Sequence, residues 1–151
     1  SGVAEPGAPQ TIALADLNED GRLDLVVGNN SSIALLLNDG AGGFTPTTGT
    51  AYPLSMPGSV RGLVATDRNE DGHTDLFVAI GGANRVSLYV GDGRGGLSFG
   101  RDYALPSQPW RVALGRVDGD QLPDLVVPCE AGVAVLLGAD TTGSHGAPVL
   151  F

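Results

Sequence analysis

The sequence predicts an all-β fold made of β-propeller blades, as three four-stranded antiparallel repeats of about 50 residues. Three observations lead to this prediction. A nine-residue acidic loop recurs at a nearly constant spacing, short apolar runs flank every copy of the loop, and no segment has the periodicity of an amphipathic helix. The 24 Gly and 10 Pro residues supply the many turns that short strands require.

The repeat length is measured from the first residue of each acidic loop. Asp67 lies 51 residues after Asp16, and Arg116 lies 49 residues after Asp67. The whole chain, 1–151, is therefore expected to be a single repeat array. The blades are expected at about 8–57, 58–106 and 107–151.

Every repeat contains its apolar runs in the same order. The first run precedes the acidic loop, the second follows it directly, and the third comes after a short connection. Continuous apolar runs indicate strands that are buried on both faces. First strands are expected at 12–15, 63–66 and 112–115, second strands at 25–27, 76–78 and 125–127, third strands at 33–37, 86–90 and 133–137, and a weaker fourth strand toward 52–54 or 103–106.

The first two acidic loops, 16–24 and 67–75, both read D-x-N-x-D-G-x-x-D. Oxygen-bearing side chains at alternate positions, with a glycine where the chain turns sharply, suit a hard cation such as Ca²⁺. Gly21 and Gly72 are expected to adopt positive φ. An ordinary Asx-rich turn is the alternative. Two such loops at the same point of a repeat favour the metal.

Other cation sites fit the sequence less well. An EF-hand needs a bidentate Glu at position 12, where this chain has Val27 and Val78, and a helix after the loop. A zinc site needs clustered cysteine or histidine, whereas the chain has one Cys and two His. Calcium is therefore the predicted ion.

The pattern aDlNeDGrlDLvVgn…ialLLndGaGgF resembles the FG-GAP/VCBS repeat of integrin α-subunit propellers, fungal integrin-like lectins and many bacterial extracellular proteins. The resemblance covers essentially the whole chain. It implies a propeller of six to eight blades, whereas the chain has three. The ring is therefore expected to be completed by another copy or by further repeats, and two copies would supply six blades.

The resemblance also implies which atoms bind the ion. Positions 1, 3, 5 and 9 supply side-chain oxygens, and position 7 supplies its backbone carbonyl, so the imidazole of His73 is expected to face solvent. The predicted ligands of two Ca²⁺ sites are Asp16, Asn18, Asp20, Arg22 (carbonyl) and Asp24, and Asp67, Asn69, Asp71, His73 (carbonyl) and Asp75.

The third loop, 116–124, departs from this pattern. Arg116 replaces the first carboxylate and Gln121 replaces the glycine. The remaining carboxylates are Asp118, Asp120 and Asp124. We expect an empty or weak third site, in which the Arg116 guanidinium forms a salt bridge with those carboxylates in place of an ion.

Charge and composition limit the possible partners. The net charge of -9 and the pI of about 4.3 argue against nucleic acid and anionic membranes. No apolar run approaches the roughly 18 residues of a membrane span. Cys129 lies in an apolar segment and is expected to be a buried, inert thiol.

No enzyme is predicted. The sequence has no apparent Ser-His-Asp or Cys-His constellation, and the glycine-rich segment 91–96 is expected to join two strands instead of opening the helix that a nucleotide site needs. Trp110 is expected to pack between blades or against a partner.

The predicted function is an extracellular or cell-surface calcium-binding module for adhesion, scaffolding or filament assembly, which associates with itself or with other repeats of its array. By resemblance, one alternative is a lectin that binds glycans between its blades. Another is a non-catalytic fragment of a larger surface protein or enzyme. The ligand is thus expected to be a protein or a glycan.

Overall fold

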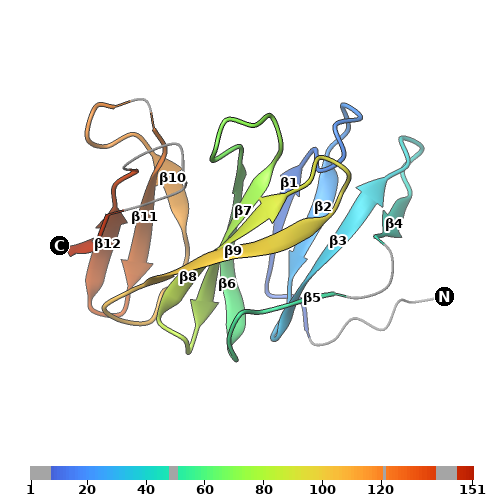
Figure 1. Ribbon diagram of the computed structural model, residues 1–151. Coiled ribbons are helices and arrows are strands. Elements are labelled where there is room, and N and C mark those ends of the chain that lie inside the picture. Colours follow the sequence, from blue (N-terminus) through green and yellow to red (C-terminus); the bar gives the residue numbers. More distant parts are fainter. Residues whose placement is uncertain (1–7, 48–50, 121, 139–145) are drawn as a thin grey trace.

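The computed structural model describes residues 8–47, 51–120, 122–138 and 146–151. These residues form thirteen strands in three antiparallel sheets that lie side by side as an open row of blades (Figure 1). The prediction of three four-stranded repeats is confirmed. The described part of the chain contains no helix long and apolar enough to cross a membrane.

Consecutive strands pair as neighbours in every blade, except that β5 pairs with β3 and not with β4. Blade 1 contains β1 (Thr11–Ala15), β2 (Asp24–Gly28), β3 (Ser32–Asn38), β4 (Phe44–Pro46) and the short β5 (Tyr52–Pro53). Blade 2 contains β6 (Ser59–Thr66), β7 (Asp75–Gly81), β8 (Arg85–Gly91) and β9 (Leu97–Ala104). Blade 3 contains β10 (Ala113–Gly115), β11 (Asp124–Cys129), β12 (Gly132–Leu136) and β13 (Val149–Leu150).

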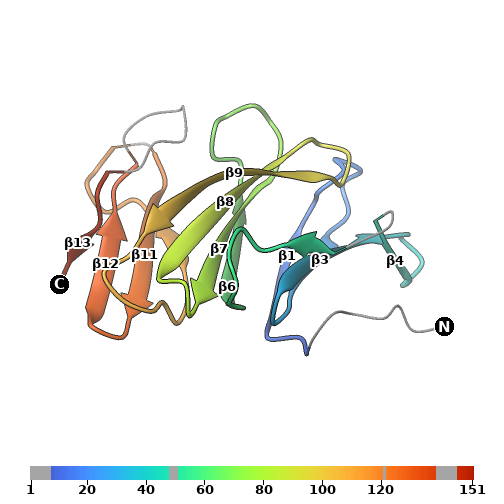
Figure 2. The same cartoon turned by 60° about the horizontal axis from the view of Figure 1, so that its bottom comes forward.

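The outer strands differ from the prediction. In blade 2, β9 begins at Leu97, directly after the turn. Most of its residues are exposed, so the strand does not form the apolar run by which the other strands are predicted. In blade 1, β4 and β5 pair with opposite ends of β3. The predicted strand start at Val112 is also wrong, because β10 begins one residue later. Figure 2 shows β4 and β13 at opposite ends of the row.

Apolar side chains occupy both faces of each sheet, because successive residues of a strand point to opposite sides. Across β1, β2 and β3, the row that faces blade 2 contains Ala13, Val26 and Leu35. The adjacent row, on the opposite face, contains Leu14, Leu25 and Leu36. A single blade therefore cannot bury its own apolar surface.

The hydrophobic core lies between the blades. Leu76 and Phe77 are neighbours on β7 and both are fully buried, but they belong to different clusters. Leu76 packs in the cluster shared by blades 1 and 2, and Phe77 in the cluster shared by blades 2 and 3. Cys129 is buried in the second cluster, as predicted. Blade 2 is thus covered on both faces.

A bulge in β6 brings two blades close together. The register between β6 and β7 shifts between Val60 and Gly62. A Cβ atom at Gly62 would lie 2.9 Å from the Cα of Arg111, at the start of blade 3. Only glycine permits this approach, because a side chain would displace backbone.

Candidate functional site

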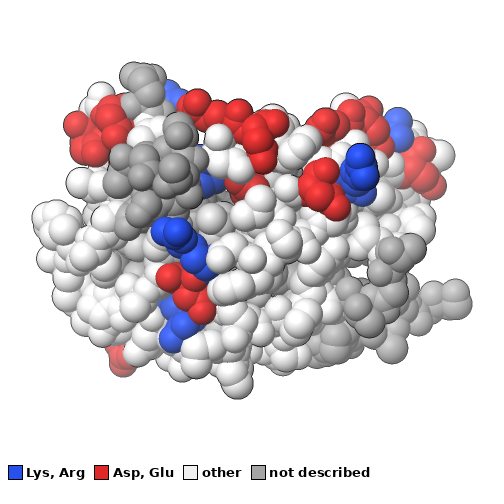
Figure 3. Space-filling model, in the orientation of Figure 1, with Lys and Arg blue, Asp and Glu red and all other residues white. Residues whose placement is uncertain are grey.

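The three acidic loops lie along one edge of the row. They connect β1 to β2, β6 to β7 and β10 to β11, and all three project from the top of the molecule in Figure 1. In Figure 3, Asp and Glu side chains gather along this same edge. The negative charge is therefore concentrated at the edge that contains the predicted metal ligands.

In the first loop, acidic and amide oxygens turn inward onto the backbone of the loop. The Asp20 amide donates to Asp16 Oδ1 at 3.2 Å and to Asn18 Oδ1 at 3.3 Å. The Gly21 amide donates to Asp16 Oδ2 at 2.8 Å, and the Arg22 amide to Asp20 Oδ1 at 2.9 Å. The oxygens at positions 1 and 3 thus converge on one N–H group.

The second loop repeats these contacts. The Gly72 amide donates to Asp67 Oδ2 at 2.9 Å, the Asp71 amide to Asn69 Oδ1 at 3.3 Å, and the His73 amide to Asp71 Oδ1 at 2.8 Å. The two loops therefore share one local structure, which their common sequence pattern explains.

Positive φ values close both turns. Gly21 has φ 80° and Gly72 has φ 89°, as predicted. Glu19 and Glu70, with φ 59° and 60°, adopt the left-handed region as well, which the sequence analysis missed. A bulky residue with positive φ is strained, so the surrounding hydrogen bonds must impose this conformation.

The carboxylate at position 5 of the first two loops is held in its charged form. Burial pushes the pKa of Asp20 upward, but hydrogen bonds from Asn18 and Arg22 outweigh it and leave the pKa below its usual value. The Arg22 guanidinium lies 2.7 Å from Asp20 Oδ2. In the second loop, the His73 amide and then Asn69 lower the pKa of Asp71. Both carboxylates are thus available to a cation at neutral pH.

The Asp at position 9 has a structural role in all three loops. Asp24, Asp75 and Asp124 are buried. Each accepts one hydrogen bond from the second residue of its own loop. Each accepts another from the last residue of the third strand or, in blade 3, from the second residue after that strand. The donors to Oδ2 are the amides of Leu17 (2.9 Å), Arg68 (3.1 Å) and Val117 (2.6 Å), and those to Oδ1 are the amides of Asn38 (2.8 Å), Gly91 (2.9 Å) and Gly138 (2.8 Å).

These contacts tie the loop to the third strand without requiring an ion. The sequence pattern alone predicts only a ligand role for these three residues. Burial raises the pKa of Asp75, with a smaller contribution from the charges of Asp71 and Asp67. A cation nearby would therefore favour the ionised form of Asp75.

The third loop brings its carboxylates together. Ligand oxygens of Asp118, Asp120 and Asp124 lie within 4.8 Å of one another. The predicted salt bridge is wrong, because the ion pairs between described residues do not include Arg116, whose side chain is exposed. Gln121 lies outside the described residues. The oxygens of Asp124 and Asp120 instead accept backbone N–H groups.

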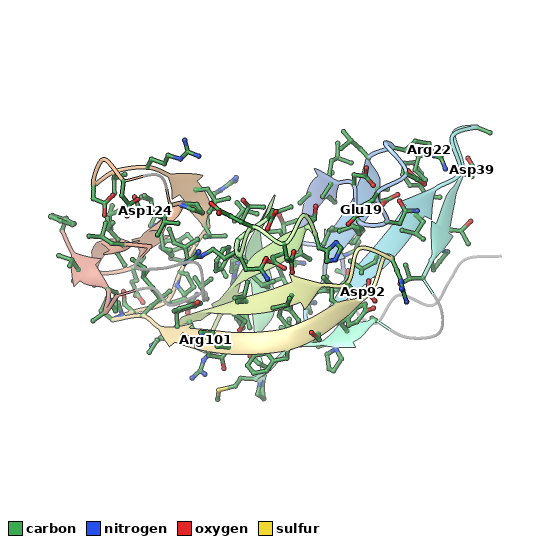
Figure 4. All side chains as sticks on the ribbon, turned by 45° about the horizontal axis from the view of Figure 1, so that its top comes forward. Glu19, Arg22, Asp39, Asp92, Arg101 and Asp124 are labelled. Carbon is green, nitrogen blue, oxygen red and sulfur yellow. The ribbon has the colours of Figure 1, made fainter. Side chains whose placement is uncertain are left out.

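The first loop also contacts the next blade. Thr74 Oγ1 donates to the carbonyl of Asp16 at 3.0 Å, and the Gly95 amide donates to the carbonyl of Leu17 at 2.9 Å. The Glu19 carboxylate contacts the imidazole of His73, and Figure 4 shows Glu19 between blade 1 and the Asp92 turn of blade 2. The His73 ring is thus partly exposed to solvent, and it also forms a contact between two blades that was not expected.

Trp110 also contacts a neighbouring blade. The guanidinium of Arg61, on β6, lies 5.9 Å from the centroid of the Trp110 ring, within the range of a cation–π interaction. The ring is nevertheless 48% exposed, so it is only partly covered by this contact.

Comparison with known proteins assigns this chain to a family. The model of FG-GAP-like repeats matches residues 16–78 and 67–127, which include all three acidic loops. The chain belongs to the FG-GAP-like repeat family. Human integrin alpha-7 is 30% identical over 88% of this FG-GAP chain, and the chain spans 13% of that relative's length.

Two solved structures share the fold. One is an Agrocybe aegerita lectin described as recognising non-reducing terminal N-acetylglucosamine, with a TM-score of 0.62, 18% identity, and coverage of 94% of this chain and 38% of the lectin. The other is the V. cholerae biofilm matrix protein Bap1, with a TM-score of 0.59, 21% identity, and coverage of 98% and 22%. At these identities the likeness concerns the β-propeller fold alone.

The Asp at position 9 should stabilise the third loop without an ion. Asp124→Ala leaves two amides without acceptors, so we expect unfolding to become easier by about 2–4 kcal/mol. Asp118→Ala, which removes an exposed acceptor from the same loop, should cost less than about 1 kcal/mol. Urea denaturation in the presence of a chelator measures both, and equal losses would contradict the structural role of Asp124.

The contact between Glu19 and His73 should be visible in the titration of the imidazole. The hydrogen bond that the imidazole donates to the Glu19 carboxylate is the main cause that raises the His73 pKa above its usual 6.5. Glu19→Gln should lower this pKa, whereas Glu70→Gln, in the loop of His73 itself, should change it less. NMR titration in a chelator measures the shift.

The effect on stability follows from the sign of this pKa shift. A raised histidine pKa adds stability that is complete below pH 6.5 and is lost as the pH rises through the folded-state value. An unchanged His73 pKa in Glu19→Gln would show that the two loops are not coupled in solution.

Proposed function

We propose that this FG-GAP chain is a calcium-binding, non-catalytic propeller module of an extracellular or cell-surface protein, and that it serves adhesion or the assembly of a scaffold or filament. The similarity to an integrin and the fold shared with a biofilm matrix protein support the adhesive role. The acidic edge in Figure 3 supports the binding of divalent cations.

The inward-facing oxygens of the first two loops, with the clustered carboxylates of the third loop, carry the proposal. Asp16 and Asn18 direct their oxygens to the same N–H group, and Asp67 and Asn69 occupy the same places in the second loop. These side chains offer only oxygen donors, and Asp20 and Asp71 stay ionised, which fits Ca²⁺ better than a thiophilic metal. The donors present therefore fit the ion that the family implies.

The ion would be held by residues at the five predicted positions. The first site would use Asp16, Asn18, Asp20, Asp24 and the carbonyl of Arg22, and the second Asp67, Asn69, Asp71, Asp75 and the carbonyl of His73. A bound Ca²⁺ would neutralise part of the charge of the edge and cross-link the loop. Because the first loop also accepts hydrogen bonds from blade 2, stiffening it would brace the junction between the blades.

The environment of the reactive side chains supports a non-catalytic role. Burial raises the pKa of Cys129, which lowers the fraction of reactive thiolate. The Asp102 carboxylate is engaged by Arg85 at 2.8 Å and by Ser55 at 2.9 Å, and it also accepts from Ser87. These polar groups link the outer strand of blade 2 to the connection that follows β5.

Calcium should stabilise the protein through the first two loops. The double variant Asp20→Ala, Asp71→Ala should lose most of the rise in Tm that Ca²⁺ causes, because each site loses one of its charged ligands. Glu130→Gln, which removes an exposed charge far from the loops in sequence, should keep the full rise. Differential scanning fluorimetry with and without Ca²⁺ makes the comparison.

Native mass spectrometry counts the ions directly. Two ions per wild-type chain and none in the double variant are expected, and a third ion would assign the Asp118 loop as a site as well. A Tm that responds equally in wild type and double variant would remove both proposed sites.

A cleft between blades supports carbohydrate binding as a second candidate. A cavity of about 500 Å³ lies between the outer strands of blade 1 and the 92–96 turn of blade 2. Its walls combine the ring of Tyr52 with the hydroxyls of Thr45 and Thr47 and the charged group of Arg94. An aromatic ring beside several hydrogen-bonding groups is a combination that suits a sugar.

A glycan array tests this candidate. Binding that Arg94→Ala weakens, while Arg101→Ala does not, would support a glycan ligand in this cleft, because Arg101 lies on the other side of blade 2. An array without hits would remove it.

A further inference from the structure

Trp110 is a large side chain that the packing of blades 2 and 3 leaves half exposed. Its ring is 48% exposed, and the guanidinium of Arg61 lies 5.9 Å from the ring centroid. Trp and Arg are two of the residue types most enriched among the side chains that dominate protein interfaces. The pair is therefore a candidate contact point for a ligand.

Backbone hydrogen bonds hold Trp110 against the turn between β11 and β12. The Trp110 amide donates to the carbonyl of Pro128 at 2.9 Å, and the Glu130 amide donates to the carbonyl of Gln108 at 2.9 Å. An isolated β-bridge joins the residues between these two contacts. The segment before β10 is thus ordered in advance, and a ligand would not have to order it on binding.

A β-bulge directs Arg61 toward the tryptophan. Val60 and Gly62 pair with consecutive residues of β7, which leaves Arg61 as the extra residue in the register. Bulges of this kind turn a side chain away from its regular direction. The Arg61 side chain crosses Gly81 of β7, where a Cβ atom would lie 2.7 Å from Nε and 2.8 Å from Cγ. The glycine therefore leaves room for the guanidinium beside the Trp110 ring.

A second arginine follows the tryptophan directly. The Cα of Arg111 lies 2.9 Å from the place of a Cβ atom on Gly62, and the Arg111 side chain is exposed. The ion pairs between described residues include Arg22 and Arg85 but neither Arg61 nor Arg111. Arg61, Trp110 and Arg111 together form what we call the basic platform, which carries two positive charges that no described carboxylate neutralises.

The basic platform lies at the edge opposite the acidic loops. In Figure 1, the connection from β9 to β10 and the start of β6 are at the bottom, whereas the acidic loops are at the top. Arg61 and Asp67 are 6 residues apart along extended chain, which corresponds to roughly 20 Å. The Debye length in physiological salt is about 8 Å, so the acidic edge is largely screened at the platform. An anionic ligand can therefore approach this edge although the net charge is -9.

The polar groups of the platform select the chemistry of the ligand. Guanidinium and indole groups donate hydrogen bonds and accept none. Sugar hydroxyls both donate and accept, whereas a carboxylate only accepts and pairs with arginine through two parallel hydrogen bonds. The exposed ring of Trp110 adds a surface for an apolar or aromatic group. The best match is a ligand in which carboxylates flank an apolar group.

We propose that the basic platform binds an acidic segment of a protein partner, in which aspartate or glutamate residues flank an apolar side chain. The carboxylates pair with Arg61 and Arg111, and the apolar side chain packs on Trp110. This inference rests on the adhesive role proposed above and names the chemistry of its ligand. The two blades that carry the platform pack on each other through one core, so the surface is formed by the described residues themselves.

Selection from a library of short random peptides tests the proposal. Peptides retained by the wild-type chain but not by the double variant Arg61→Ala, Trp110→Ala should be rich in Asp and Glu next to Phe, Leu or Trp. A library that gives no retained peptide would overturn the proposal, and so would selected peptides without acidic residues or equal retention by both proteins.

Fluorescence anisotropy of the most enriched peptide measures the contribution of each side chain. Arg61→Ala should weaken binding by about tenfold or more, because a charge-assisted pair is lost. Trp110→Ala should weaken it by a similar factor. Arg101→Ala, which removes the same charge from an exposed site on β9, should change the affinity by less than about twofold. An equal effect of Arg101→Ala would show that only net charge matters and would overturn the site.

Two further variants change the surroundings of the platform and keep its three residues. Gly81→Ala should weaken binding, because the new methyl group would displace the Arg61 side chain from its path. Glu130→Gln should strengthen binding, because it removes an exposed carboxylate from the turn that holds Trp110. Wild-type affinity in Gly81→Ala would contradict a preformed platform.

The outcome is separable from that of the calcium sites. A chain that gains thermal stability from Ca²⁺ but retains no acidic peptide keeps the calcium-binding function and loses the basic platform as a binding site. Retention of acidic peptides without any response of Tm to Ca²⁺ has the opposite meaning. If heparin or oligogalacturonate binds in a way that Arg61→Ala abolishes while acidic peptides do not bind, the choice of a protein ligand is overturned.

Discussion

Packing between blades is the interaction on which this structure depends. Each sheet is one layer thick and apolar on both faces, so its hydrophobic surface is buried only when other sheets cover it on either side. Leu76 and Phe77 illustrate this constraint, because these neighbours on β7 belong to two separate cores. Blade 2 satisfies the constraint on both faces, whereas blades 1 and 3 each satisfy it on one. The outer faces of blades 1 and 3 therefore have the same apolar character as the faces that pack between blades.

The acidic loops combine two kinds of stabilisation that act at different places. The buried Asp at position 9 joins the loop to the third strand by hydrogen bonds, and it does so even at Asp124, where the loop has lost its first carboxylate and its glycine. The residues at positions 1, 3 and 5 lie at the exposed edge and order the tip of the loop. The loop is thus a structural element of the blade first and a candidate binding site second.

Much of this architecture can be predicted from the sequence, because the three repeats can be aligned and equivalent positions compared. Strand order and the placement of the loops follow directly from the 51- and 49-residue spacing. The contacts between repeats were harder to foresee. Position 2 holds Leu17, Arg68 and Val117, a set with no common chemistry, so its place between blades is visible only in three dimensions. The pair of Glu19 and His73 is 54 residues apart and depends on how the blades pack. The persistence of Asp124 in an altered loop was a signal for its structural role, and it could have been used.

Asp16 takes part in two events that are usually considered separately. Its side chain faces the interior of the first loop, while its main-chain carbonyl accepts the hydroxyl of Thr74 in the next blade. With the proposed Ca²⁺ bound at the loop, binding and the packing of the next blade would be coupled through this residue, and such a coupling is reciprocal. A loop whose successor blade is in place would then bind its cation more tightly than a loop without one. A fall in free cation would in turn weaken the junctions between blades before it unfolds any single sheet.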